Sequence, residues 1–308
     1  MTSYRAILIA GPTASGKSAL AVRLAQRHDG VVINADSMQV YRNLEILTAR
    51  PAASDLKAAR HALYGYVAGD EPYSVGRWMA DVAEVMAECW ANGITPILTG
   101  GTGLYFKALL EGLSPIPAIP APLREHWRAE AQRLGPAALH ALLSARDLAT
   151  AAKLPPTDPQ RLTRALEVLD ATGRGLADWQ REPGRPVLDE SETLRLVVSH
   201  ERAELHRRSN ARFDAMIAAG AVEEARALAA QGYSSELPVM RALGVAPLIA
   251  AAESRLPLAE AVEQAKLDTR QYIKRQETWL RRNMMSWKWT STQDMERYSM
   301  ENFTFKHF

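Results

Sequence analysis

The eight-residue segment after the first apolar run constrains this chain most. It reads Gly11-Pro12-Thr13-Ala14-Ser15-Gly16-Lys17-Ser18, the G-x-x-x-x-G-K-[ST] spacing of a phosphate-binding loop (P-loop) in nucleotide-binding and ATP-binding proteins. The apolar run 6–10 before it predicts a strand, and residues 17–26 after it predict a helix. Glycines let backbone amides curl around a phosphate, and the helix N-terminus adds its positive dipole end. The segment therefore predicts a site where Lys17 reaches terminal phosphates and Ser18 ligates Mg²⁺.

The first third of the chain alternates strand-like and helix-like patterns. Apolar runs at 6–10, 31–33 and 94–98 alternate with helical spacing over 17–26 and 75–91. Such alternation predicts an α/β fold with a parallel sheet flanked by helices, in which ligands bind beyond the carboxyl ends of the strands. The segments Asn34-Ala35-Asp36-Ser37 and Gly100-Gly101-Thr102-Gly103 follow two of these strands. We therefore expect both segments to lie beside the first loop.

A proline-rich connector divides the chain. Four prolines fall within the nine residues 114–122, which is typical of a stiff linker. Residues 123 to about 173 read as almost purely helical, and 194–198 again read as a strand. We predict an all-helical subdomain at 115–193, inserted into a core formed by 1–114 and 194–290. Further helices are expected at 203–218, 221–230, 239–251 and 258–282, followed by a tail at 291–308 with no assigned role.

The composition narrows the class of protein. Hydrophobic residues make up 47% of the chain, enough for a packed core, and the net charge is only +2. The single cysteine, Cys89, lies in a helical apolar pattern and is expected to be a buried thiol without a disulfide. The sequence has no signal-peptide pattern and no membrane-length apolar run, so we expect a cytoplasmic protein without membrane contact. Scattered histidines and the absence of a G-x-S-x-G motif argue against a zinc site and a serine hydrolase.

Asp36 is the first candidate for catalysis, because it follows a buried-type strand close to the phosphate loop. Its carboxylate suits either of two roles, a general base aimed at an acceptor or a group that positions Mg²⁺. The neighbouring Ser37, Gln39 and Tyr41 can hydrogen-bond or stack, which favours an acceptor nearby. The spacing alone leaves both roles open.

Basic residues concentrate in two helical regions. The insertion carries Arg124, Arg128, Arg133, Lys153, Arg161 and Arg164, and the last long helix carries Lys266, Arg270, Lys274, Arg275, Arg281 and Arg282. Tyr272, Trp279, Trp287 and Trp289 lie among or just after the second set. Charge runs on helices are usually solvated faces, whereas bases interleaved with aromatic residues are typical of nucleic-acid contact. The pattern leaves these two readings open.

Eight segments of the chain stand out together, at residues 11–18, 34–42, 48–51, 72–74, 100–105, 158–168, 237–244 and 269–276. In combination they resemble the tRNA dimethylallyltransferase (isopentenyltransferase) family. The resemblance runs in family order from residue 11 to about 282. The chain departs from the family's usual pattern at Ser18 (threonine), Leu47 (glycine) and Arg50 (lysine), at His61-Ala62-Leu63 (paired histidines), and at Val245-Ala246-Pro247, where the family tends to have an aromatic and basic residues.

The resemblance implies transfer of a dimethylallyl group from dimethylallyl diphosphate to N6 of the adenine beside the anticodon of tRNA, with Mg²⁺ as cofactor. It implies Asp36, Thr102, Lys17 and Arg241 as catalytic residues, and the loop Gly11, Pro12, Thr13, Ala14, Ser15, Gly16, Lys17 and Ser18 as the diphosphate site, with Ser18 on the metal. It further implies that the protein is a monomer and binds the anticodon stem-loop through Asp36, Ser37, Met38, Gln39, Thr102, Arg124, Gln160, Arg161, Leu162, Thr163 and Arg164.

Three other functions remain open at this point. A P-loop kinase for a small metabolite would explain the loop and the sheet, but not the basic helices. A prenyltransferase acting on free adenine nucleotides would share the core without needing 160–164. A P-loop RNA-binding protein without turnover would be indifferent to the loss of Asp36.

Overall fold

The computed structural model describes residues 3–291 and 304–305. The chain divides into two compact units, one formed by Met1–Leu110 with Val187–Phe308 and the other by Glu111–Pro186. From the sequence we placed the limits of the insertion at 115 and 193. The two units are described separately below.

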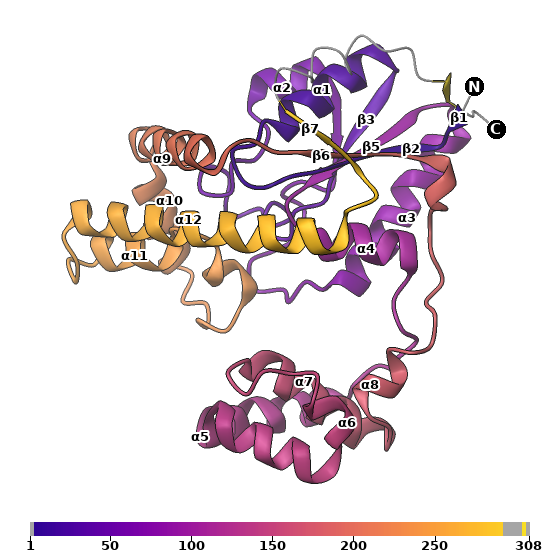
Figure 1. Cartoon of the computed structure of the whole chain (residues 1–308). Helices are drawn as coiled ribbons and strands as arrows, with labels where there is room; N and C mark the ends of the chain where they lie inside the picture. The colour runs from indigo at the N-terminus through magenta and orange to yellow at the C-terminus, as the bar shows by residue number, and fades with distance from the viewer. Residues whose placement is uncertain (1–2, 292–303, 306–308) are drawn as a thin grey trace. The chain divides into compact units, whose positions relative to one another are not determined.

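The first unit is built on a six-stranded sheet in which every described pairing is parallel. Its order is β4-β3-β5-β2-β6-β7, with β2 at the centre between β5 and β6 (Figure 1). The strands are β2 (Ala6–Ala10), β3 (Gly30–Asn34), β4 (Arg60–Ala62), β5 (Thr95–Gly100), β6 (Thr193–Val198) and β7 (Lys288–Thr290). The expected α/β class and its four predicted strands are confirmed, whereas the short edge strands β4 and β7 were not predicted.

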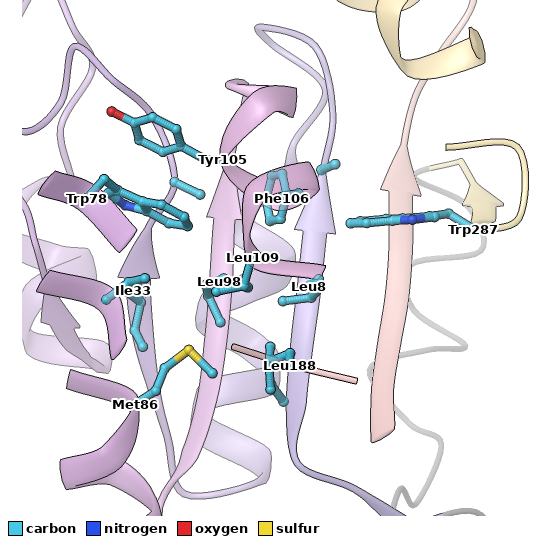
Figure 2. Close-up of a cluster of buried hydrophobic side chains, with 14 of the residues drawn as sticks. Leu8, Ile33, Trp78, Met86, Leu98, Tyr105, Phe106, Leu109, Leu188 and Trp287 are labelled. Atoms are coloured by element: carbon cyan, nitrogen blue, oxygen red, sulfur yellow. The ribbon is translucent and has the colours of Figure 1, made fainter. Parts of the chain in front are cut away.

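Helices cover both faces of this sheet, because alternate residues of each buried strand point to opposite sides. Ile7 and Ile9 of β2 pack with Leu20 and Leu24 of α1 (Lys17–Arg27). Leu8 instead packs with side chains of α3 (Val75–Ala91) and α4 (Gly103–Glu111), as Figure 2 shows. Burial on both faces explains why β2 reads as an unbroken apolar run.

The cluster in Figure 2 also fixes the end of β3. Trp78 is fully buried, stacks on Tyr105 with ring centroids 4.3 Å apart, and donates from Nε1 to the Asn34 carbonyl oxygen at 2.9 Å. Cys89 lies in the same cluster as a buried free thiol, as expected. The rigid packing at this point holds the residues that follow β3.

A second core in this unit is helical. It packs Val40, Tyr41, Leu44 and Leu47 against side chains of the helices beyond β6. These helices are α9 (Arg202–Ala218), α10 (Ala221–Ala229), α11 (Val245–Ala252) and α12 (Leu258–Asn283); the remaining short ones are α2 (Ala53–Ala58), η1 (Glu190–Glu192) and η2 (Pro238–Arg241).

The expected single helix over 239–251 is wrong. Residues 238–241 form the 3-10 turn η2, and α11 begins only at Val245. Gly244 separates the two with a φ of 83°, a backbone conformation that side-chain-bearing residues rarely adopt. The chain therefore turns at 242–244 and exposes Arg241 at an edge instead of burying it within a helix.

The second unit is entirely helical in its secondary structure, with α5 (Ala121–Arg146), α6 (Leu148–Ala151), α7 (Pro159–Thr172) and α8 (Leu176–Trp179). Trp127, Leu139, Leu143, Leu162 and Leu166 form the centre of its own hydrophobic core. Helix α5 is broken at Gly135, whose φ is 73°, just before Pro136. Helix α7 begins at an Asp158 cap, whose side chain accepts from the Arg161 amide at 3.1 Å.

The ends of the first unit meet in a small second sheet, in which β1 (Ser3–Tyr4) pairs in parallel with β8 (Thr304–Phe305). Most of the expected tail, residues 292–303 and 306–308, lies outside the described residues. Within the described part of the chain, no helix is both long and apolar enough to cross a membrane.

Candidate active site

Three loops meet at one edge of the sheet, because β3, β5 and β2 are neighbours and run in the same direction. Ala10 pairs with Gly100, and Asn34 pairs with Thr99, so the three strands end almost level. The segments expected to lie together from the sequence are therefore adjacent: the loop at 11–16, the segment at 35–37 and the turn at 101–102.

The loop at 11–16 is shaped by close packing and unusual backbone angles. A Cβ on Gly11 would lie 2.5 Å from the Val198 carbonyl oxygen, so only glycine fits there. Ala14 and Gly16 both have positive φ, 65° and 87°, and Gly16 caps the start of α1. Lys17 donates from Nζ to the Pro12 carbonyl oxygen at 3.3 Å, while Ser18 is exposed in the first turn of the helix. The loop thus presents the start of α1, where backbone amides suit an anion.

Asp36 is held by a short network after β3. The Asn34 side chain accepts from the Asp36 amide at 2.8 Å and donates to the carbonyl oxygens of Asp36 and Leu63 at 2.9 and 3.0 Å. Asp36 Oδ1 accepts from the Met38 amide at 2.9 Å. Its other oxygen, Oδ2, faces Gly101, at 3.5 Å from where a Cβ of that residue would lie. One carboxylate oxygen therefore fixes the turn and the other is directed toward the turn at 101–102.

Thr102 joins the ends of β5 and β3. Its amide donates to the Ala35 carbonyl oxygen at 3.3 Å, and its Oγ1 accepts from the Ser37 amide at 3.0 Å. The Thr102 hydroxyl also donates to Ser37 Oγ at 3.4 Å. Thr102 therefore orients the segment that carries Asp36.

These strand ends form one wall of a pocket of about 290 Å³. The pocket combines charged side chains with an apolar wall, as a site for a charged group on an apolar chain requires. Its lining residues are Thr13, Asp36, Ser37, Met38, Leu47, Thr48, Ser209, Arg212, Phe213, Met216, Arg241, Ala242, Leu243, Thr269, Tyr272 and Arg275.

The charges around Asp36 act on one another. Removal from water lowers the pKa of Lys17 from 10.5 to about 8; the negative charge of Asp36 opposes this shift and the positive charge of Arg212 adds to it. Burial, reinforced by Asp36, raises the pKa of Tyr272 above its usual value, so this phenol stays neutral. Lys17, Arg212 and Asp36 therefore interact electrostatically.

Arg212 and Gln276 are among the residues of this site that were not predicted from the sequence. Arg212 lines the pocket from α9 while part of its side chain remains exposed. Gln276 of α12 is 6% exposed and hydrogen-bonds both to the loop at 11–16 and to the turn at 101–102. Gln276 belongs to a segment quoted above for the resemblance, which was a usable signal. Arg212 lies among other charged residues of a helix, and that pattern gave no signal that it belongs to a site.

Arg241 lies at the pocket, where its Nη2 donates to Glu236 Oε2 at 2.6 Å. Gln39 has its side-chain nitrogen engaged by the carbonyl oxygens of Thr48 and Ala49, at 2.8 and 2.9 Å. The side-chain nitrogen of Gln39 therefore holds the loop beside the pocket. In this arrangement it is already engaged and is not free to donate to RNA.

The remaining predicted RNA-contacting residues belong to the second unit. Arg124 lies on α5, and residues 160–164 lie in the first turns of α7. Gln160, Arg161 and Arg164 are exposed, whereas Leu162 is fully buried and Thr163 is 8% exposed. Leu162 packs in the hydrophobic core of this unit, so the surface available to RNA is that of the polar residues.

Comparison with known proteins identifies the family. The sequence model described as IPP transferase matches residues 39–283, and a second, described as isopentenyl transferase, matches residues 4–68. The chain belongs to the IPP transferase family. It is therefore an enzyme that transfers prenyl groups, and the likeness seen in the sequence is confirmed.

Individual members of the IPP transferase family extend the match over nearly the whole chain. A tRNA dimethylallyltransferase of Methylocella silvestris is 50% identical over 96% of this chain and 98% of its own length. One of Mesorhizobium japonicum is 50% identical over 91% of this chain and 87% of its own.

Solved structures of the family share the fold. The tRNA isopentenylpyrophosphate transferase of Bacillus halodurans matches with a TM-score of 0.67 and 30% identity, over 97% of this chain and 95% of its own. A eukaryotic dimethylallyltransferase solved acting on tRNA matches with a TM-score of 0.77 and 28% identity, over 90% of this chain and 70% of its own.

Proposed function

We propose that this chain transfers the dimethylallyl group of dimethylallyl diphosphate to N6 of the adenine beside the anticodon of a tRNA. The carbon–oxygen bond of the donor breaks, a carbon–nitrogen bond to N6 forms, diphosphate leaves with the bonding electrons, and N6 gives up one proton. The observation that carries the proposal is the pocket that joins Thr13 of the phosphate loop to Asp36. Relatives that match nearly their full length carry the name tRNA dimethylallyltransferase, which supports the choice of acceptor.

The donor's diphosphate is assigned to the loop at 11–18. Lys17 lies in this loop, and Arg212, which lines the pocket together with Asp36, adds to the lowering of the pKa of Lys17. Both can neutralise charge that grows on the departing diphosphate. The apolar wall, which includes Leu47, Phe213 and Leu243, suits the five-carbon chain.

The residues present fit a Mg²⁺ ion that is bound mainly by the substrate. The Ser18 hydroxyl is exposed at the start of α1, and Mg²⁺ commonly uses one or two protein oxygens together with substrate phosphates. Among the described residues, no group of three or more His, Cys, Asp or Glu side chains forms a metal cage of its own. When bound, the ion would offset part of the charge on the diphosphate.

Asp36 is assigned the role of general base. The lone pair of an exocyclic amine is delocalised into the adenine ring, so removal of a proton during attack makes N6 a better nucleophile. Thr102 holds the segment that carries this carboxylate, because its Oγ1 accepts from the Ser37 amide at 3.0 Å. The adenine must leave the RNA stack to reach this pocket, as enzymes that modify bases require.

The deciding experiment supplies radiolabelled dimethylallyl diphosphate and Mg²⁺ with unmodified tRNA, AMP and ATP as parallel acceptors. Label in tRNA alone is the expected result. Label in AMP or ATP would show that the acceptor is a free adenine nucleotide and not tRNA. Label in no acceptor, with transfer of phosphate from ATP to a metabolite, would favour the alternative that the protein is a P-loop kinase for a small metabolite.

The pKa of Lys17 predicts how donor use depends on pH. With a pKa of about 8, the ammonium is mostly charged at pH 7 in the free enzyme and mostly neutral at pH 9, where it binds diphosphate weakly. We expect kcat/KM for the donor to fall about tenfold between pH 7 and pH 9, while kcat stays flat because bound diphosphate keeps Lys17 charged. In Lys17→Arg, which stays charged, the fall should disappear. An unchanged fall in that variant would assign the titration to another group.

Arg161 provides a test of the second unit. It is 68% exposed and pairs with Asp158 at 3.3 Å, so Arg161→Ala should leave the fold intact. We expect the KM for tRNA to rise several-fold, since one phosphate contact is lost, with donor KM unchanged. Arg181→Ala is the matched control, because Arg181 is 69% exposed and pairs with Asp178 in the same unit. A change confined to donor KM would contradict the role.

A further inference from the structure

One side chain joins the two halves of the pocket. Gln276 Oε1 accepts from the Thr13 amide at 3.0 Å, and its Nε2 donates to the Gly101 carbonyl oxygen at 3.1 Å. Thr13 belongs to the loop assigned to the donor, and Gly101 to the turn beside Asp36. A primary amide both accepts and donates, so it can hold the two loops at once, which a carboxylate or an aliphatic side chain cannot do.

Hydrogen bonds continue from Gly101 to the acceptor segment. The next residue, Thr102, is bonded to the Ala35 carbonyl oxygen at 3.3 Å and to the Ser37 amide at 3.0 Å, on either side of Asp36. The turn and the amide are in close contact, because a Cβ on Gly101 would lie 2.3 Å from Gln276 Nε2. A continuous series of contacts therefore links the phosphate loop to the segment that carries Asp36.

Helix α12 is anchored where it carries this amide. The neighbouring Glu277 has a buried side chain, 3% exposed, and accepts from Arg202 Nε of α9 at 2.8 Å. Trp279 packs against Gly103, where a Cβ would lie 2.1 Å from its ring. Glu277 and Trp279 hold the helix just after Gln276, so the amide that contacts both loops projects from an anchored part of α12.

We propose that Gln276 is a positioning residue that couples the donor and acceptor sites, so that diphosphate bound at the loop at 11–18 tightens the binding of tRNA at Asp36. The coupling rests on the proposed function, which assigns those two sites. Diphosphate orders Thr13, and through Gln276 it also orders Gly101 and the segment at 35–37, so tRNA meets a segment that is already fixed. By linkage, tRNA must tighten diphosphate by the same factor.

The test measures the dissociation constant of unmodified tRNA with and without inorganic diphosphate and Mg²⁺. For the unchanged protein we expect diphosphate to tighten tRNA binding about fivefold to tenfold. In Gln276→Met, which matches the side chain in length but forms neither bond, the ratio should fall to about one. Gln264→Met is the matched control, because Gln264 is an exposed residue of the same helix that bonds only locally to Asp268, at 2.8 Å; its ratio should equal that of the unchanged protein.

Gln276→Glu is a second variant that tests the coupling if Gln276→Met is unstable. A glutamate can accept from Thr13 but cannot donate to Gly101, so its ratio should also be about one. The thermal unfolding midpoint of each variant separates a general loss of stability from a loss of coupling. No tightening in the unchanged protein, or a preserved ratio in either folded Gln276 variant, would overturn the coupling. Failure of the unchanged protein to label tRNA would instead overturn the proposed function.

Discussion

Replacement of Asp36 by asparagine is expected to slow dimethylallyl transfer by about 10²–10⁴-fold, the usual effect of losing a general base. Asparagine keeps an oxygen that can accept from the Met38 amide, now at 2.9 Å from Asp36 Oδ1, so the turn after β3 should survive. What is lost is the acceptor for the N6 proton. Single-turnover rates with saturating donor and tRNA would measure the effect on the chemical step.

Binding measurements separate this role from a role in holding tRNA. We expect Asp36→Asn to bind unmodified tRNA nearly as tightly as the unchanged protein, since no phosphate contact is removed. Asp70→Asn serves as the control for a change of charge, because Asp70 is exposed and does not line the pocket. A rate near that of the unchanged protein would remove Asp36 as the base, and a rate restored by excess Mg²⁺ would favour a role in positioning the metal.

Arg212→Ala is expected to lower kcat by about 10²–10³-fold, the range found when one group that stabilises developing charge is removed. Arg212 lines the same pocket as Thr13 and Asp36, and its positive charge contributes to lowering the pKa of Lys17. Because negative charge on the diphosphate increases as the carbon–oxygen bond breaks, the cation contributes more in the transition state than in the ground state. The expected signature is therefore a fall in kcat that exceeds the rise in donor KM.

Two further variants test this assignment. Arg212→Lys keeps the charge and should recover part of the rate, though not all of it, because lysine lacks the planar fork of the guanidinium. Arg207→Ala is the matched control, since Arg207 lies on the same helix but outside the pocket and pairs with Glu204 at 2.7 Å. An equal loss in Arg207→Ala would attribute the effect to α9 as a whole, and a rise in donor KM alone would make Arg212 a binding residue only.

The sequence predicted the sheet well where strands are buried on both faces. Residues 6–10 form an unbroken apolar run, and residues 194–198 are apolar except for Arg195, so short-range patterns reveal both strands. The edge strands β4 and β7 are three residues each and partly exposed, so their side chains carry no such pattern. Their pairing depends on a neighbouring strand that is distant in the sequence, as with Val31 and Arg60. The start of α11 was missed because Gly244 ends one turn and begins a helix within an apolar stretch.

Within the site, the phosphate loop and the segments around Asp36 and Thr102 could be placed from the sequence. Each follows a strand within a few residues, and parallel strands place their carboxyl ends at one edge. Arg212 could be placed in this site only from the folded structure, and so could the contacts of Gln276 with both loops, because α9 and α12 come from more than a hundred residues away. A strand and its following turn are fixed by local backbone chemistry, whereas the approach of a distant helix depends on packing of the whole core, which no short segment encodes.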